Sequence, residues 1–377
     1  MEAPVYLDYN ATTPHDPEVI GAMRPYLETH FGNPSSSHWY GTATRNAVEN
    51  ARGQVACLLN AQPEEIVFTS GGTESNNYAI KGTAFALRDK GNHIITTQIE
   101  HPAVINVCKF LEEHGFEVTY GPVDEFGRVS VSDIEKAITP QTILITIMHA
   151  NNEVGTIQPT EQISGLAKEH AIVMHTDAAQ SVGKIPVDVN ALGVDLLSVA
   201  GHKLYAPKGI GALYIRQGTQ LAKFIHGAGQ ERGHRAGTEN VLEIVGLGKA
   251  CEVAQRELET NISHIKAMRD RLHNRLRDKL RDIRLNGHPE SRLPNTLSLS
   301  FRGIEANTLL FEIKDYVAAS AGAACHSGGV GISYVLKAMN VPIEWAKGTV
   351  RFSTGRMTTA AEVDRAVNII SNAVIRL

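Results

Sequence analysis

The sequence predicts an α/β protein in which a large, mostly parallel sheet is followed by a smaller α+β part. Between residues 64 and 215, short apolar runs alternate with helical patterns, which is typical of a parallel sheet with helices packed on it. Most of these runs are continuously apolar, as expected of strands that are covered on both faces. From about residue 257 the pattern changes, which indicates a second domain.

Each predicted strand of the large sheet is a run of four to eight residues that is rich in apolar side chains. These runs cover residues 64–70, 92–98, 116–120, 142–148, 171–177, 195–199 and 211–215. The stretches between them have helical patterns, so the order of elements favours repeated strand–helix–strand units.

The second domain is predicted from three patterns near the end of the chain. Apolar residues recur at helical spacing from Leu258 to Leu280, which predicts one long amphipathic helix. The run 295–301 (NTLSLSF) alternates strictly, which predicts a half-exposed antiparallel strand. A last helix has its apolar residues on one face, and Thr359 and Glu362 form a capping box at its start. We expect a large domain over residues 15–257 and a small domain made of 1–14 and 258–377.

Composition narrows the possible function classes. Of the 377 residues, 42% are hydrophobic and 20% are charged, as in ordinary globular proteins. The formal net charge is −4 without a basic stripe, so a dedicated nucleic-acid surface is not expected. No apolar run reaches the roughly 18–20 residues of a membrane span. The start, MEAPVYLDYN, has no signal-peptide pattern, so the expected location is the cytoplasm.

The four cysteines lie far apart and lack the spacing of a zinc site, so no metal site is expected. Cys57, Cys108 and Cys251 are interpreted as small buried hydrophobic residues. Cys325 lies in ASAGAACHSGGVG, a run with too little bulk for a core, where a buried cysteine in a turn and a functional thiol both remain open.

Polar residues lie at the ends of five of the seven predicted strands. Ligands of open α/β sheets bind beyond the carboxyl ends of the strands, so these positions are candidates for one site. Each residue alone has an ordinary explanation as a helix cap or a loop hydrogen bond. The candidates, in chain order, are Gly72 and Thr73, His101, Asn151 and Asn152, Asp177 and Gln180, and His202 and Lys203.

Together these residues match the demands of a phosphorylated pyridine aldehyde. A glycine turn at a helix start favours a phosphate, because backbone N–H groups and the helix dipole face the anion. The carboxylate of Asp177 is suited to keep a pyridine nitrogen protonated. The amine of Lys203 is suited to bind the aldehyde as a Schiff base.

The sequence resembles the cysteine desulfurase and selenocysteine lyase family. The resemblance runs in order from about residue 5 to the end and is carried by YLDYNATTP, FGNPSSSH, FTSGGTESNN, EHPAV, HANNEVGTIQP, HTDAAQSVGK, GHKLYAPKGIGALYI, RAGTEN, GAACHSG and RFSTGR. It implies a fold type I, aspartate aminotransferase-like enzyme that uses pyridoxal 5'-phosphate.

The resemblance also implies a role for each matched residue that contacts the cofactor. Lys203 would bind the cofactor aldehyde and move protons at the substrate α carbon. His101 would stack on the cofactor ring and share in catalysis, while Asp177 would pair with the ring nitrogen. The remaining cofactor contacts would be Asn152 and Gln180 at the phenolic oxygen, Gly72, Thr73 and His202 at the phosphate, and Thr238 at the phosphate across a homodimer interface. Many relatives have a serine where this chain has Ala200, so its phosphate site lacks one hydroxyl.

Substrate binding and sulfur transfer are implied in the same way. Arg351 would hold the substrate carboxylate, which suits a planar bidentate donor, with Asn10 and Asn152 beside it. The thiolate of Cys325 would take sulfur from L-cysteine as a persulfide, leave L-alanine, and pass the sulfur to an acceptor such as an iron–sulfur scaffold protein. His326 is a candidate activator of that thiol.

Three other functions remain open at this stage. A selenocysteine lyase would release selenide from L-selenocysteine without depending on Cys325. An aminotransferase of the same fold would give a keto acid. A silent scaffold would be colourless, although Lys203, Asp177 and His101 argue against it.

Overall fold

The computed structural model describes residues 3–321 and 332–377, so Cys325 and His326 lie outside the described residues. Seven strands form the large sheet, in the order β2-β8-β7-β6-β5-β3-β4. Strand β8 is antiparallel to both of its neighbours, and the other pairs are parallel. The strands are β2 (Ile66–Thr69), β3 (His93–Thr97), β4 (Glu117–Gly121), β5 (Thr142–Thr146), β6 (Val173–Asp177), β7 (Leu196–Ala200) and β8 (Gly211–Ile215). All seven predicted strands and the mostly parallel sheet are thus confirmed.

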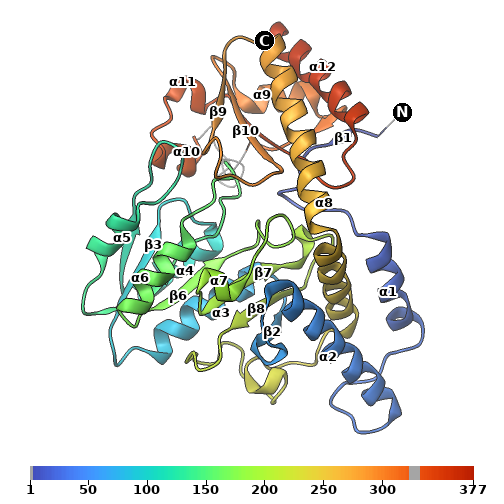
Figure 1. Cartoon of the computed structure of the whole chain (residues 1–377), viewed down its shortest axis with the longest axis vertical. Coiled ribbons are helices and arrows are strands. Elements are labelled where there is room, and N and C mark those ends of the chain that lie inside the picture. Colours follow the sequence, from blue (N-terminus) through green and yellow to red (C-terminus); the bar gives the residue numbers. More distant parts are fainter. Residues whose placement is uncertain (1–2, 322–331) are drawn as a thin grey trace.

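Helices cover both faces of this sheet (Figure 1). They are α1 (Pro17–Glu28), α2 (Trp39–Leu59), α3 (Gly72–Ala86), α4 (Pro102–Glu112), α5 (Val131–Ala137), α6 (Thr160–Glu169) and α7 (Val189–Leu192), with short 3₁₀ turns η1 (Pro63–Glu65), η2 (Gly201–Lys203) and η3 (Glu231–Gly233). Helices α3 and α4 bury their apolar sides on one face, and α2, α5, α6 and α7 on the other. Successive strand residues enter different clusters, which explains the continuously apolar runs: Ile94 belongs to one and Ile95 to the other.

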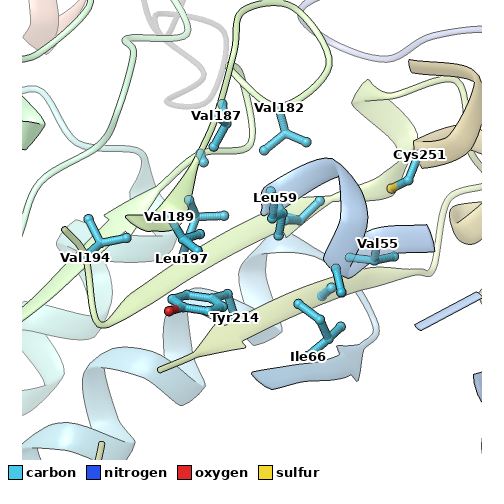
Figure 2. Packing of buried hydrophobic residues seen from close by; sticks show 14 of the residues in the cluster. Val55, Leu59, Ile66, Val182, Val187, Val189, Val194, Leu197, Tyr214 and Cys251 are labelled. Atoms are coloured by element: carbon cyan, nitrogen blue, oxygen red, sulfur yellow. The ribbon is translucent and has the colours of Figure 1, made fainter. Parts of the chain in front are cut away.

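The larger of these clusters lies between the sheet and α2. Figure 2 shows Val55 and Leu59 of α2 beside the strands that carry Leu197 and Tyr214. The close packing of these fully buried side chains holds the strands in place, and so fixes where their carboxyl ends lie.

Apart from α8, the remaining strands and helices of the described residues form the smaller part, near the C-terminus in Figure 1. They are β1 (Val5–Tyr6), β9 (Ile283–Asn286), β10 (Thr296–Phe301), β11 (Val317–Ala318), β12 (Thr349–Ser353), α9 (Ala306–Ile313), α10 (Tyr334–Ala338), α11 (Ile343–Ala346) and α12 (Ala360–Arg376). Strands β12-β10-β9 form an antiparallel sheet, and β1 pairs in parallel with β11. This pairing brings the start of the chain against its C-terminal part.

Strand β10 is antiparallel as predicted, but the prediction that it is half-exposed is wrong. All six of its residues are buried. Its polar face is buried because the serines have partners: Asn286 Nδ2 donates to Ser300 Oγ at 2.8 Å, and Ser300 Oγ lies 2.7 Å from Thr349 Oγ1. Buried hydroxyls are tolerated where they are hydrogen-bonded, so an alternating pattern here does not mark a solvent-facing side.

Helix α8 (Val241–Lys279) is longer than the predicted helix and begins 16 residues before the position where the sequence pattern changes, residue 257. Its first half, with Cys251 and Ala254, belongs to the core of the large sheet. Its second half, with Leu272 and Leu276, belongs to the core of the smaller part. The predicted domain boundary near residue 257 falls inside this continuous helix and stays a prediction.

Three smaller sequence predictions can be compared with the structure. The capping box of Thr359 and Glu362 at the start of α12 is confirmed. Cys108 and Cys251 are buried as predicted, whereas Cys57 is exposed on α2, where Gln255 Nε2 lies 3.2 Å from its sulfur. Across residues 3–321 and 332–377, every helix is either too short or too polar to cross a bilayer.

Candidate active site

The predicted strand-end residues, except Asn151, meet at one cavity of about 330 Å³. Its walls include residues from the carboxyl ends of β6 and β7, from the start of α3 and α4, and from β12 of the smaller part. The predicted site residues among them are Asn10, Gly72, Thr73, His101, Asn152, Asp177, Gln180, His202, Lys203 and Arg351. The topology therefore brings together residues that the sequence separates by more than 300 positions.

Two predicted or candidate residues lie elsewhere. Asn151 is buried outside the cavity wall, where its amide donates to the Ile99 carbonyl at 3.0 Å and accepts from two backbone N–H groups. Thr238 lines a different cavity, together with Arg235 and Asn240. Cys325 lies outside the described residues.

The start of α3 opens on the cavity. Gly71 is the N-cap residue and has a φ of +142°, a conformation that favours glycine. A Cβ on Gly72 would lie 3.2 Å from Cβ of Ala200, so the helix start packs closely on the end of β7. Thr73 follows inside the helix and is not the cap. The first backbone N–H groups of a helix have no intrahelical acceptor, so this end of α3 can bind an anion.

Asp177 ends β6, and its carboxylate is held at the cavity wall by two hydrogen bonds. Asn76 Nδ2 donates to Oδ2 at 2.7 Å, and the backbone N–H of Ala179 donates to Oδ1 at 3.0 Å. Asn76 was not among the predicted site residues. The signal was its place in GGTESNN, one helical turn after Gly72, which puts both residues on one face of α3.

Lys203 lies in η2, directly after β7, and it lines the cavity. Burial lowers the pKa of Lys203 to about 8; Asp177 and Asp8 oppose this effect, and Arg351 adds to it. An ordinary lysine is almost fully charged near neutral pH, whereas this one is partly in the neutral, nucleophilic form.

The two histidines of the site each have a hydrogen bond at ring nitrogen Nδ1. His101 caps α4, and its Nδ1 accepts from the N–H of Ala103 at 3.1 Å, which leaves Nε2 to carry the proton of the neutral ring. His202 Nδ1 lies 3.2 Å from the hydroxyl of Thr12. Burial lowers the pKa of His202 to about 4, and the charges of three nearby lysines make a smaller contribution in the same direction. The ring is therefore neutral at physiological pH.

Arg351 projects from β12 and is oriented by two partners. Its Nη2 pairs with Asp8 Oδ1 at 2.8 Å, and its Nη1 donates to the Asn152 carbonyl at 3.0 Å. Its Nε is buried and, within the described part of the chain, has no hydrogen-bond partner. A guanidinium with an unused buried donor is suited to bind a carboxylate. Asp8 was not among the predicted site residues.

Asn10 lines the cavity, but its side chain is bonded to the protein at both ends. Nδ2 donates to Thr296 Oγ1 at 2.8 Å, and Oδ1 accepts from Asn295 Nδ2 at 2.8 Å. Its role in substrate binding stays a prediction. Over residues 3–321 and 332–377, no three His, Cys, Asp or Glu side chains are grouped closely enough to hold a metal ion.

Comparison with known proteins places the chain in a family. Residues 5–366 match the model of the family described as aminotransferase class-V. A cysteine desulfurase IscS of Dictyoglomus turgidum is 50% identical over 100% of this chain and 96% of its own length. Another, of Methanosarcina thermophila, is 50% identical over 99% of this chain and 92% of its own length.

Solved structures agree with this result. A NifS-like protein superposes with a TM-score of 0.93 at 39% identity, covering 99% of this chain and 100% of its own. A structure of SspA in complex with cysteine gives a TM-score of 0.84 at 39% identity, over 94% of this chain and 99% of its own. The chain belongs to the aminotransferase class-V family. The curated relatives named above are cysteine desulfurases within it, so the family inferred from the sequence motifs is confirmed.

Proposed function

We propose that this protein is a cysteine desulfurase that uses pyridoxal 5'-phosphate to convert L-cysteine to L-alanine and transfers the sulfur to Cys325. The observation that carries the proposal is the position of Lys203: a lysine of lowered pKa shares one cavity with a fixed carboxylate, Asp177, and with a buried arginine, Arg351. The names of the relatives support the same activity.

The residues of the cavity fit the proposed cofactor. The start of α3 offers backbone donors for the phosphate, and a Cβ on Gly72 would already press on Ala200 at 3.2 Å. Asp177 offers an acceptor for the protonated ring nitrogen, and Lys203 offers the amine for the aldehyde. When bound, the cofactor supplies an electron sink that makes the α carbon of the substrate acidic.

Residues of the chain would then bind the substrate, transfer the proton and accept the sulfur. Arg351 orients the substrate by its carboxylate, and Lys203 takes and returns the proton at the α carbon. The thiolate of Cys325 attacks the substrate sulfur, so that an S–S bond forms as the C–S bond breaks. The three-carbon product takes up protons and leaves as L-alanine, and the persulfide sulfur passes to an acceptor such as an iron–sulfur scaffold protein.

The lowered pKa of Lys203 predicts how the cofactor-free protein reacts with pyridoxal phosphate. Only the neutral amine attacks an aldehyde, so the rate should rise about tenfold per pH unit below pH 8 and level off above it. Stopped-flow absorbance at the visible edge measures this rate. An N-acetylated lysine amide should keep rising toward pH 10, and the same continued rise in the protein would contradict a pKa of about 8.

The assignment to L-cysteine is tested by replacing Cys325. In Cys325→Ala, sulfide and alanine release from L-cysteine should fall by at least about 100-fold, because the sulfur has lost its acceptor. The matched control is Cys57→Ala, at an exposed cysteine outside the site, which should leave the rate unchanged. Selenide release from L-selenocysteine that persists in the variant, with little wild-type activity on L-cysteine, would select the selenocysteine lyase; a keto-acid product would select the aminotransferase.

The remaining parts of the proposal concern partners and location. The protein is proposed to act as a homodimer in which Thr238 reaches the cofactor phosphate of the partner subunit. Support comes from the place of Thr238, which lines a different cavity from Lys203 in its own chain. The cytoplasm is the proposed location.

A further inference from the structure

Lys184 is a buried lysine behind the cavity wall. Its exposed fraction is 7%, and among the described residues no carboxylate lies within ion-pairing distance of its amine. Burial, and then the charges of Lys203 and Arg351, lower its pKa well below the usual value. Burying a cation without a counter-ion is costly, so a lysine at such a place calls for an explanation in function.

The hydrogen bond of Lys184 goes to a residue of the site. Nζ donates to the side-chain oxygen of Gln180, Oε1, at 2.9 Å. The amide nitrogen of Gln180, Nε2, donates to the backbone carbonyl of Asn10 at 3.1 Å. A carbonyl can only accept, so the nitrogen of the amide must face Asn10 and its oxygen must face Lys184. The orientation of the Gln180 amide is therefore fixed at both ends.

This orientation determines what Gln180 can offer to the cavity. Its oxygen is engaged by Lys184, one of its two N–H groups is engaged by Asn10, and its side chain lines the cavity wall. The second N–H group of the Gln180 amide therefore remains available to a ligand in the cavity. Asn10 is itself held by hydrogen bonds to Thr296, the first residue of β10, and to Asn295, so the arrangement is anchored on the smaller part as well. A fixed donor suits an anionic oxygen and excludes an acceptor at that place.

We propose that Lys184 is a positioning residue, which holds Gln180 as a hydrogen-bond donor toward the phenolic oxygen of the cofactor. The inference rests on the proposed binding of pyridoxal phosphate. A donor at that oxygen stabilises its ionised form and thereby lowers the pKa of the bound chromophore. Lys184 thus sets the protonation state of the cofactor without touching it.

The test is a pH titration of the visible absorption band of the protein with bound pyridoxal phosphate. The wild type is compared with Lys184→Met. Loss of the hydrogen bond from Lys184 to Gln180 should raise the midpoint of this titration by about 0.5 to 1 pH unit, which is the size expected for one lost hydrogen bond. Lys184→Arg, which keeps a donor, should titrate closer to the wild type. Lys168→Met, at an exposed lysine of α6, is the matched control and should not move the midpoint.

A double-mutant cycle separates positioning from a direct effect of the lysine charge. If Lys184 acts through Gln180, then Gln180→Met raises the midpoint by itself, and adding Lys184→Met produces little further shift. Equal shifts by Lys184→Met in both backgrounds would show a direct charge effect and overturn the inference, as would an unmoved midpoint in Lys184→Met.

The same measurements distinguish failure of the positioning role from misfolding of the variant and from failure of the proposed function. Lys184→Met removes a buried amine that has no counter-ion, so it should fold with a thermal midpoint at or above that of the wild type. A wild-type protein that shows no visible band after incubation with pyridoxal phosphate would overturn the proposed function itself. A normal wild-type band with an unmoved midpoint in Lys184→Met overturns the positioning role alone.

Discussion

Lys203→Ala is expected to abolish the visible absorption band that appears when the protein is incubated with pyridoxal phosphate. The rate of sulfide release from L-cysteine should fall by roughly 10⁴-fold, because one residue supplies both the covalent attachment and the proton transfer. The spectrum of the dialysed protein and an initial-rate sulfide assay measure the two effects. The methyl side chain of the alanine variant has no amine, so raising the pH should restore neither the absorption band nor the rate.

The control for this variant lies in the same segment. Lys208 is exposed five residues further along and is not part of the cavity wall. Lys208→Ala should keep both the band and the rate. If Lys203→Ala retained the band after dialysis while Lys208→Ala lost it, the covalent assignment would be wrong.

Asp177→Asn is expected to lower the rate of sulfide release by about 10³-fold. A neutral amide of the same size cannot keep the ring nitrogen of the cofactor protonated, so the electron sink is weakened while the shape of the site is kept. The amide oxygen can still accept from Asn76, which now bonds the carboxylate at 2.7 Å. The initial rate and the affinity of the cofactor-free protein for pyridoxal phosphate should both be measured.

A matched carboxylate lies at the opposite end of the same sheet. Asp195 precedes β7, and its Oδ2 accepts from the N–H of Met174 at 2.9 Å, far from the cavity wall. Asp195→Asn should cost some stability but leave the rate within a few-fold of the wild type. An Asp177→Asn enzyme as active as Asp195→Asn would refute the role of Asp177.

Much of the large sheet was predictable because its strands are local signals. Each strand is a short apolar run, Asp177 is the last residue of its strand and Lys203 follows its strand within three residues, so the rule for parallel sheets was enough to group them. Helix α8 was placed too late because its first half, from Val241, is apolar on most sides and lacks the charged background that marks the second half.

Other contacts of the site could not be predicted, since they depend on how distant segments meet. Asp8 and Arg351 are 343 positions apart and form their ion pair only after β1 pairs with β11 beside β12. Asn76 depends on the rotation of α3 against β6. The burial of Ser298 and Ser300 depends on partners from β9 and β12, which the alternation within one strand does not reveal.

The length of α8 has a consequence for how substrates are selected. Its 39 residues form one unbroken helix, which at 1.5 Å per residue extends over about 58 Å. Because the same helix is packed into both cores, the part that carries Arg351 cannot easily swing away from the part that carries Lys203. For the proposed roles of Arg351 and Lys203, the distance between the carboxylate anchor and the reactive amine is therefore preorganised. We expect such a site to accept α-amino acids and to reject amino acids with a longer spacer.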